Sequence, residues 1–180
     1  SSDVCSSDLG AQALNEIVPQ GMSRLNADEL PQIVHQAGEK HIDALKAAYA
    51  SVGVEAHCVP FVEDMAGAYG WADLVICRAG ALTIAELAAA GVASILVPFP
   101  HAVDDHQTGN AKFLVNVGGA FLLPQTELTA DTGFAGVSQA GRRVPQLLQG
   151  HVRRAGEEGT FLPAIFRCRR AGCTPPIWFV

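Results

Sequence analysis

The chain has 180 residues, of which 49% are hydrophobic and 17% charged, so it can bury the core of one domain and is not disordered by composition. Its formal net charge of −6 argues against nucleic acid as the partner. We predict neither a signal peptide nor a transmembrane helix, because every apolar run falls well short of about 18 residues.

Short apolar strands alternate with helices from about residue 11 onward. Gly91 follows the fourth helix, where glycine commonly ends helices. This alternation predicts an α/β fold, a parallel sheet with helices on both faces, whose ligands bind at the carboxyl ends of the strands. The predicted helices span residues 11–25, 39–51, 64–69, 81–90 and 105–117, and the predicted strands span residues 32–36, 55–61, 73–77, 94–97 and 120–123.

The two ends of the chain do not follow this pattern. Residues 1–9 (SSDVCSSDL) are polar and without period, and we interpret them as translated vector or adapter sequence. Residues 141–180 hold seven Arg, no Lys and two Glu, whereas residues 1–140 hold 5 Lys and Arg against 16 Asp and Glu. We interpret residues 138–180 as an aberrant tail, frameshifted or disordered; a genuine basic tail that binds an anionic surface is the alternative. The predicted domain is therefore residues 10–137.

Five cysteines are an odd number, and none forms a CxxC pair, so neither a disulfide framework nor a zinc site is indicated. Cys58 and Cys77 lie in apolar runs and are interpreted as small core residues. Cysteine usage of this kind fits a reducing, cytoplasmic setting.

The most informative motif is CRAGALTIAE at residues 77–86, where a buried strand turns into a helix. The free N–H groups at a helix start bind anions, Gly80 permits a close backbone approach, and Thr83 adds a hydroxyl. Glu86 lies one turn after Thr83 and can accept hydrogen bonds from a ribose diol. Together they favour a nucleoside diphosphate. The alternative is that Gly80 serves a turn, Thr83 caps the helix and Glu86 is solvated.

A second polar cluster, PFPHAVDDHQTGNA at residues 98–111, follows the next buried strand. Its donors and acceptors suit a hydroxyl-rich ligand such as a sugar. A metal is less favoured because the cluster has no His pair at i, i+4 and no distant third ligand. The simpler interpretation is a helix start capped by Asp104 or Asp105.

A third motif, FVEDM at residues 61–65, closes a strand. Its backbone can pair with a planar base, although Asp64 is more simply read as a helix cap.

These motifs occur in the order found in a known family. Through HQAG at residues 35–38, FVEDM at 61–65, the 72–86 segment, PFP at 98–100 and DDHQTGNA at 104–111, the chain resembles the C-terminal half of the bacterial MurG family. Members of that family are N-acetylglucosaminyltransferases that convert lipid I to lipid II in peptidoglycan synthesis. The resemblance implies a Rossmann-like domain, the donor-binding half of a GT-B glycosyltransferase, with no cofactor and no metal.

The resemblance also implies roles for individual residues. The backbone at Val62 would meet uracil, the helix start at Gly80, Ala81, Leu82 and Thr83 would hold the diphosphate, and Glu86 would take the ribose hydroxyls. Gln107 and its neighbour His106 would read the GlcNAc hydroxyls, and Arg78 would help to neutralise the leaving group. His106 departs from the Gln of some relatives, and of the family's glycine-rich turn before the first helix this chain keeps only Gly10 and Ala11.

In the family, the general base and the lipid-facing surface belong to the N-terminal domain. We therefore expect UDP-GlcNAc as the donor, lipid I as an acceptor bound through that other domain, and a parent enzyme attached peripherally to the cytoplasmic face of the inner membrane. The chain by itself is expected to be inactive. Two alternatives stay open: another UDP-sugar enzyme of GT-B fold, such as a different glycosyltransferase or a UDP-GlcNAc 2-epimerase, and a non-catalytic nucleotide-binding fragment.

Overall fold

The computed structural model describes residues 4–27, 30–100, 106–129 and 176–180. Their helices are α1 (Val4–Met22), α2 (Ile42–Val52), α3 (Met65–Trp71), α4 (Ala81–Ala90), α5 (His106–Asn116) and the short 3₁₀ helix η2 (Gln125–Glu127). Their strands are β1 (Ile33–Gln36), β2 (His57–Val59), β3 (Leu74–Cys77), β4 (Ala93–Leu96), β5 (Ala120–Leu122) and β6 (Ile177–Phe179).

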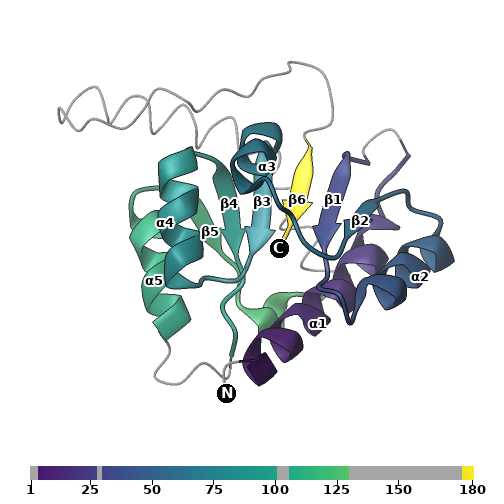
Figure 1. Cartoon of the computed structure of the whole chain (residues 1–180). Helices are drawn as coiled ribbons and strands as arrows, with labels where there is room; N and C mark the ends of the chain where they lie inside the picture. The colour runs from purple at the N-terminus through teal and green to yellow at the C-terminus, as the bar shows by residue number, and fades with distance from the viewer. Residues whose placement is uncertain (1–3, 28–29, 101–105, 130–175) are drawn as a thin grey trace.

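All strands of the described residues join one parallel sheet in the order β2-β1-β6-β3-β4-β5. The arrows of Figure 1 run the same way, so the carboxyl ends of the strands share one edge. α1 and α2 pack together on one face of the sheet, and α4 and α5 pack together on the other. The predicted parallel α/β sheet is confirmed.

Each strand sends alternate side chains to opposite faces of the sheet, as the period of two requires. Leu74 and Ile76 of β3 pack in one core cluster with residues of α1 and α2. Val75 and Cys77 pack in a second cluster with residues of α3, α4 and α5. Both faces are therefore covered, which explains why this strand is apolar throughout.

Helix ends follow local sequence signals. Gly91 adopts a left-handed conformation (φ 63°) after α4, and the Asp64 side chain accepts a hydrogen bond from the Gly67 N–H at 2.8 Å, capping α3. α4 spans the predicted residues 81–90. The predictions of a helix end at Gly91 and a cap at Asp64 are both confirmed.

One buried polar pair lies within the α1 and α2 face. The His35 Nδ1 atom lies 3.0 Å from the Tyr49 hydroxyl, and its imidazole ring packs 5.1 Å from the Phe179 ring of β6. His35 is 1% exposed. Burial penalises the charged imidazolium and lowers the pKa of His35 to about 3, so the ring is neutral at pH 7.

Described elements lie outside the predicted domain of residues 10–137 at both ends. α1 already includes residues 4–9, which the sequence analysis set aside. Ile177–Phe179, predicted to stay out of the fold, form β6 between β1 and β3, with Trp178 and Phe179 fully buried. A three-residue apolar stretch carries no period of its own; its burial comes from the strands on either side. Residues 138–175 of the predicted tail lie outside the described residues.

Candidate functional site

The turns that follow β1, β2, β3 and β4 lie along one edge of the sheet, because the strands are parallel. The predicted site residues Val62, Arg78 and Glu86 come from the segments that leave this edge. Ligands of open parallel sheets bind at this edge, and the structure therefore brings the sequence motifs to the expected place.

The start of α4 has no side-chain cap. Gly80 is its N-cap residue, and the first intrahelical bond runs from the Ile84 N–H to the Gly80 carbonyl at 2.9 Å. Ala81 is exposed and Leu82 is 74% exposed, so solvent reaches this end of the helix. The N–H groups of residues 81–83 come before the first intrahelical donor, the Ile84 N–H, and together with the helix dipole they can bind an anion.

Gly80 is not required by its backbone conformation. Its φ of −64° and ψ of 147° suit any residue, and a Cβ added there would meet only the Thr83 Oγ1 at 3.5 Å, an ordinary contact. Glycine therefore leaves room beside the helix start that the folded chain itself does not fill. That room lets a ligand approach the backbone closely.

Glu86 lies one turn into α4 and is half-buried. Its Oε2 atom accepts a hydrogen bond of 2.9 Å from the Tyr69 hydroxyl of α3. Sequence reasoning missed Tyr69, because a tyrosine on a short apolar helix gives no motif. One signal was available: Tyr69 is an aromatic residue with a polar tip, and buried tyrosine hydroxyls usually find a hydrogen-bond partner.

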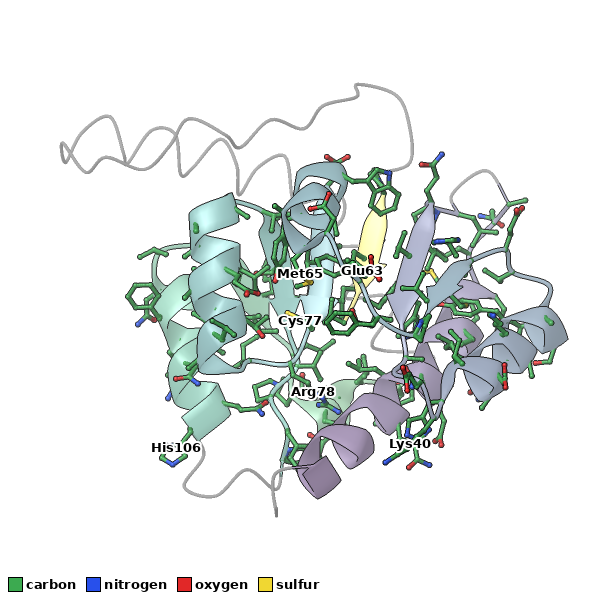
Figure 2. The ribbon with its side chains drawn as sticks, viewed as in Figure 1. Lys40, Glu63, Met65, Cys77, Arg78 and His106 are labelled. Atoms are coloured by element: carbon green, nitrogen blue, oxygen red, sulfur yellow. The ribbon has the colours of Figure 1, made fainter. Side chains whose placement is uncertain are left out.

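Arg78 joins the ends of β3 and β4. Its Nη1 atom donates to the carbonyls of Val97 at 3.0 Å and Pro98 at 3.3 Å, and its guanidinium carbon lies 5.6 Å from the centre of the Phe99 ring. Burial lowers the pKa of Arg78 to about 10, so the group still carries its charge at neutral pH. Figure 2 shows Arg78 at the carboxyl end of β3. Its predicted part in neutralising a leaving group stays a prediction.

The first turns of α5 are tied to the same two segments. The Gln107 Oε1 atom accepts a hydrogen bond from the Phe99 N–H at 2.9 Å, and the Asn110 Nδ2 atom donates to the Ala79 carbonyl at 3.2 Å. The Gln107 carbonyl oxygen is thereby engaged, and its NH₂ group is the part suited to a sugar hydroxyl. His106 is exposed at the start of α5 (Figure 2). The predicted cap residues Asp104 and Asp105 lie outside the described residues.

The backbone of Val62 is held by a side chain of β1. Its N–H donates to the Gln36 Oε1 atom at 3.2 Å, and Val62 itself is half-buried. A planar base that pairs with this backbone must therefore replace the Gln36 bond or use the Val62 carbonyl. Gln36 belongs to the HQAG motif, but its contact with Val62 could not be read from the sequence.

Within the described residues, this edge of the sheet offers neither an exposed cysteine thiol nor a candidate metal-binding cluster. Cys77 is fully buried and burial raises the pKa of its thiol to about 12; Cys58 is half-buried, and burial raises its pKa also. The prediction of core cysteines is confirmed by their packing. No group of three His, Cys, Asp or Glu side chains able to hold a metal was found in the described part of the chain.

Comparison with known proteins decides the family. The profile of the glycosyltransferase family 28 C-terminal domain matches residues 8–140. The chain belongs to glycosyltransferase family 28. The sheet, the α4 turn and the flanking segments described above all lie in the matched region, apart from β6.

Two similar curated proteins both carry the name UDP-N-acetylglucosamine–N-acetylmuramyl-(pentapeptide) pyrophosphoryl-undecaprenol N-acetylglucosamine transferase. The protein of Dechloromonas aromatica is 82% identical over 128 residues, which are 71% of this chain and 36% of the relative. That of an Azoarcus species is 64% identical over 146 residues, 81% of this chain and 40% of the relative. The chain thus spans well under half the length of these relatives.

Solved structures agree with this family. The crystal structure of Acinetobacter baumannii MurG superposes with a TM-score of 0.71 at 42% identity, over 88% of this chain and 47% of that one. The fold is therefore that of the Rossmann-like C-terminal half of a GT-B enzyme. In the described part of the chain, none of the helices combines the length and hydropathy that crossing a membrane requires.

Proposed function

We propose that residues 10–137, completed by β6, form the donor-binding domain of an enzyme that transfers GlcNAc from UDP-GlcNAc to lipid I, giving lipid II in peptidoglycan synthesis. The observation that carries the proposal is the uncapped, exposed start of α4, with open space at Gly80 and a held carboxylate at Glu86 one turn later. The names of the relatives, which are GlcNAc transferases, support it.

In this proposal each part of the donor meets one element of the site. The N–H groups of Ala81, Leu82 and Thr83, with the α4 dipole, bind the diphosphate beside Gly80. Glu86 accepts from the ribose hydroxyls, and the backbone at Val62 pairs with uracil. Each role uses a group that lies at or next to the carboxyl edge of the sheet.

The sugar would lie toward α5. Gln107 is held against the Phe99 backbone and would present its NH₂ group to a GlcNAc hydroxyl, with His106 beside it. Arg78 keeps a positive charge close to the turn that starts α4, and this charge favours the anionic leaving group.

Transfer then proceeds by inversion. The acceptor hydroxyl attacks the anomeric carbon as the bond to the UDP oxygen breaks, and charge develops on the departing diphosphate. The α4 N–H groups stabilise that charge in place. A general base takes the proton of the acceptor hydroxyl, and we place it on the other domain of the longer enzyme. The chain alone is therefore expected to bind the donor without transferring its sugar.

The acceptor is a lipid-linked molecule in the names of the relatives, which contain a pyrophosphoryl-undecaprenol group. A substrate carried on a polyprenyl lipid confines the reaction to a membrane surface. We therefore propose that the longer enzyme works as a peripheral protein at the cytoplasmic face of the bacterial inner membrane, where nucleotide-sugar donors are available.

Calorimetric titration of the 180-residue chain with UDP-GlcNAc tests donor binding. We expect saturable binding, weakened about tenfold or more by Glu86→Ala, which removes hydrogen bonds to a charged group. Glu55→Ala is the matched control, because Glu55 is exposed and precedes β2, at the opposite edge of the sheet.

Absence of both binding heat and NMR shift changes at millimolar UDP-GlcNAc would refute donor recognition. Unchanged affinity in Glu86→Ala would remove Glu86 from the site. UDP-glucose or UDP-galactose binding as tightly as UDP-GlcNAc would instead favour another UDP-sugar enzyme of the same architecture.

A further inference from the structure

Tyr69 donates its hydroxyl hydrogen to Glu86, the residue that the proposed function places against the ribose. The bond of 2.9 Å links α3 to α4, two helices that pack on the same face of the sheet. It engages one carboxylate oxygen, Oε2, and leaves Oε1 as the atom suited to a ligand. Glu86 is half-buried on a helix that solvent reaches. Without the bond to Tyr69, its side chain would have several accessible rotamers.

The Tyr69 ring is itself fixed. It is 7% exposed and packs edge-on against Trp178 of β6, with ring centres 4.9 Å apart and planes at 67°. Trp178 is fully buried in a strand bonded on both sides, to β1 and to β3. The position of the Tyr69 hydroxyl is therefore set by the centre of the sheet rather than by the surface.

The chemistry of the pair fits one direction of hydrogen bonding. Burial and the neighbouring Glu86 carboxylate raise the pKa of the Tyr69 hydroxyl, which stays protonated and acts as the donor. An ionised carboxylate that accepts from a fixed hydroxyl loses rotamer freedom before the ligand arrives, so less freedom is lost on binding.

We propose that Tyr69 is a positioning residue of the donor site. Its hydroxyl holds the Glu86 carboxylate in the orientation that accepts hydrogen bonds from a ribose diol. This inference rests on the proposed function, because it needs Glu86 to meet the ribose. A hydrogen bond that only ties α3 to α4 predicts a different result, since it would change stability without any dependence on the ribose hydroxyls.

The test compares two tyrosine variants with two nucleotides. The full chain, Tyr69→Phe and Tyr49→Phe are titrated with UDP and with 2′,3′-dideoxy-UDP, and thermal unfolding followed by circular dichroism checks that each variant is folded. Tyr49→Phe is the matched control, because it also removes a tyrosine hydroxyl that bonds a side chain, that of His35, on the other face of the sheet.

We expect Tyr69→Phe to weaken UDP binding about fivefold, the usual effect of losing one hydrogen bond, and to leave 2′,3′-dideoxy-UDP binding unchanged. Tyr49→Phe should change neither affinity. Equal losses for both nucleotides, or no loss for UDP, would overturn the inference. If the unsubstituted chain does not bind UDP, both the proposed function and this inference are wrong. If the chain binds UDP and Glu86→Ala weakens that binding but Tyr69→Phe does not, only the role of Tyr69 is wrong.

Discussion

Each face of the sheet carries a tyrosine hydroxyl bonded to a polar side chain, and one member of each pair packs on an aromatic ring of β6. On the α1 and α2 face, the Tyr49 hydroxyl pairs with His35 at 3.0 Å, and the His35 ring packs on Phe179. On the other face, the Tyr69 hydroxyl pairs with Glu86 at 2.9 Å, and the Tyr69 ring packs on Trp178. Phe179 and Trp178 are neighbours in β6 and point to opposite faces.

The difference between the pairs lies in charge and exposure. His35 is buried and neutral, so its pair can contribute only to stability and to the register of α2 on the sheet. Glu86 is half-buried on the helix that starts at the polar edge, so its pair can meet a ligand. A tyrosine hydroxyl thus stabilises the fold on one face and, in our proposal, orients a binding group on the other.

Removing the Trp178 side chain, on which Tyr69 packs, should have the largest effect on the free energy of unfolding. Trp178→Ala takes away a fully buried ring and should lower the free energy of unfolding by about 3–5 kcal/mol, a large share of the stability of a small domain. Urea unfolding followed by circular dichroism measures this change.

Trp71→Ala is the control for that substitution, since Trp71 ends α3 and is 37% exposed. It should cost about 1 kcal/mol or less. Equal effects of the two substitutions would show that β6 does not hold the centre of the sheet.

Lowering the pH should reduce the stability of the face that holds the His35–Tyr49 pair. The pKa of His35 is about 3 in the folded chain against 6.5 when unfolded, so the stability it confers is complete above pH 6.5 and is lost progressively as the pH falls toward 3. Between pH 7.5 and pH 5 this loss amounts to about 2 kcal/mol. Urea midpoints at the two pH values measure it.

His35→Gln isolates the contribution of this ring, because glutamine does not titrate and can still bond the Tyr49 hydroxyl. The variant should lose about 2 kcal/mol less than the parent chain over the same pH interval. An identical pH dependence would mean that other groups cause the acid sensitivity.

Alanine substitution should have a smaller effect on stability, and a different one at the two turns that contain Gly38 and Gly80. Gly38, after β1, has a φ of +80°, so Gly38→Ala should cost about 1 kcal/mol of stability. Gly80, after β3, has an ordinary backbone, so Gly80→Ala should change stability by less than about 0.5 kcal/mol.

For nucleotide binding we expect the reverse order. The Gly80→Ala methyl group would displace a phosphate from the α4 N–H groups and weaken UDP-GlcNAc binding about tenfold, whereas Gly38→Ala should bind normally once folded. Unchanged binding by Gly80→Ala would show that the open side of Gly80 faces no ligand.

Most regular elements could be predicted from the sequence because their ends carry local signals. Gly91 and Asp64 mark helix ends by their own backbone and side-chain preferences, and the strands are short apolar runs between such signals. β6 could not be predicted, because its place depends on its pairing with β1 and β3. No property of residues 177–179 alone indicates that pairing.

The candidate site was predictable in position but not in its bonds. The motif at residues 77–86 identified the α4 turn, since glycine, threonine and glutamate at that spacing have local consequences. The contacts of Arg78 with Val97, of Gln36 with Val62 and of Tyr69 with Glu86 join residues 17 or more positions apart, and only the packing of the sheet brings them together.

The place of β6 has a consequence for how the sheet folds. Among the described strands, β6 comes after the others in chain order but lies inside the sheet, with β1 and β2 on one side and β3, β4 and β5 on the other. Until β6 joins, the β1–β2 pair and the β3–β4–β5 group have no backbone hydrogen bonds in common. Such late, long-range closure slows folding and leaves two open strand edges exposed meanwhile.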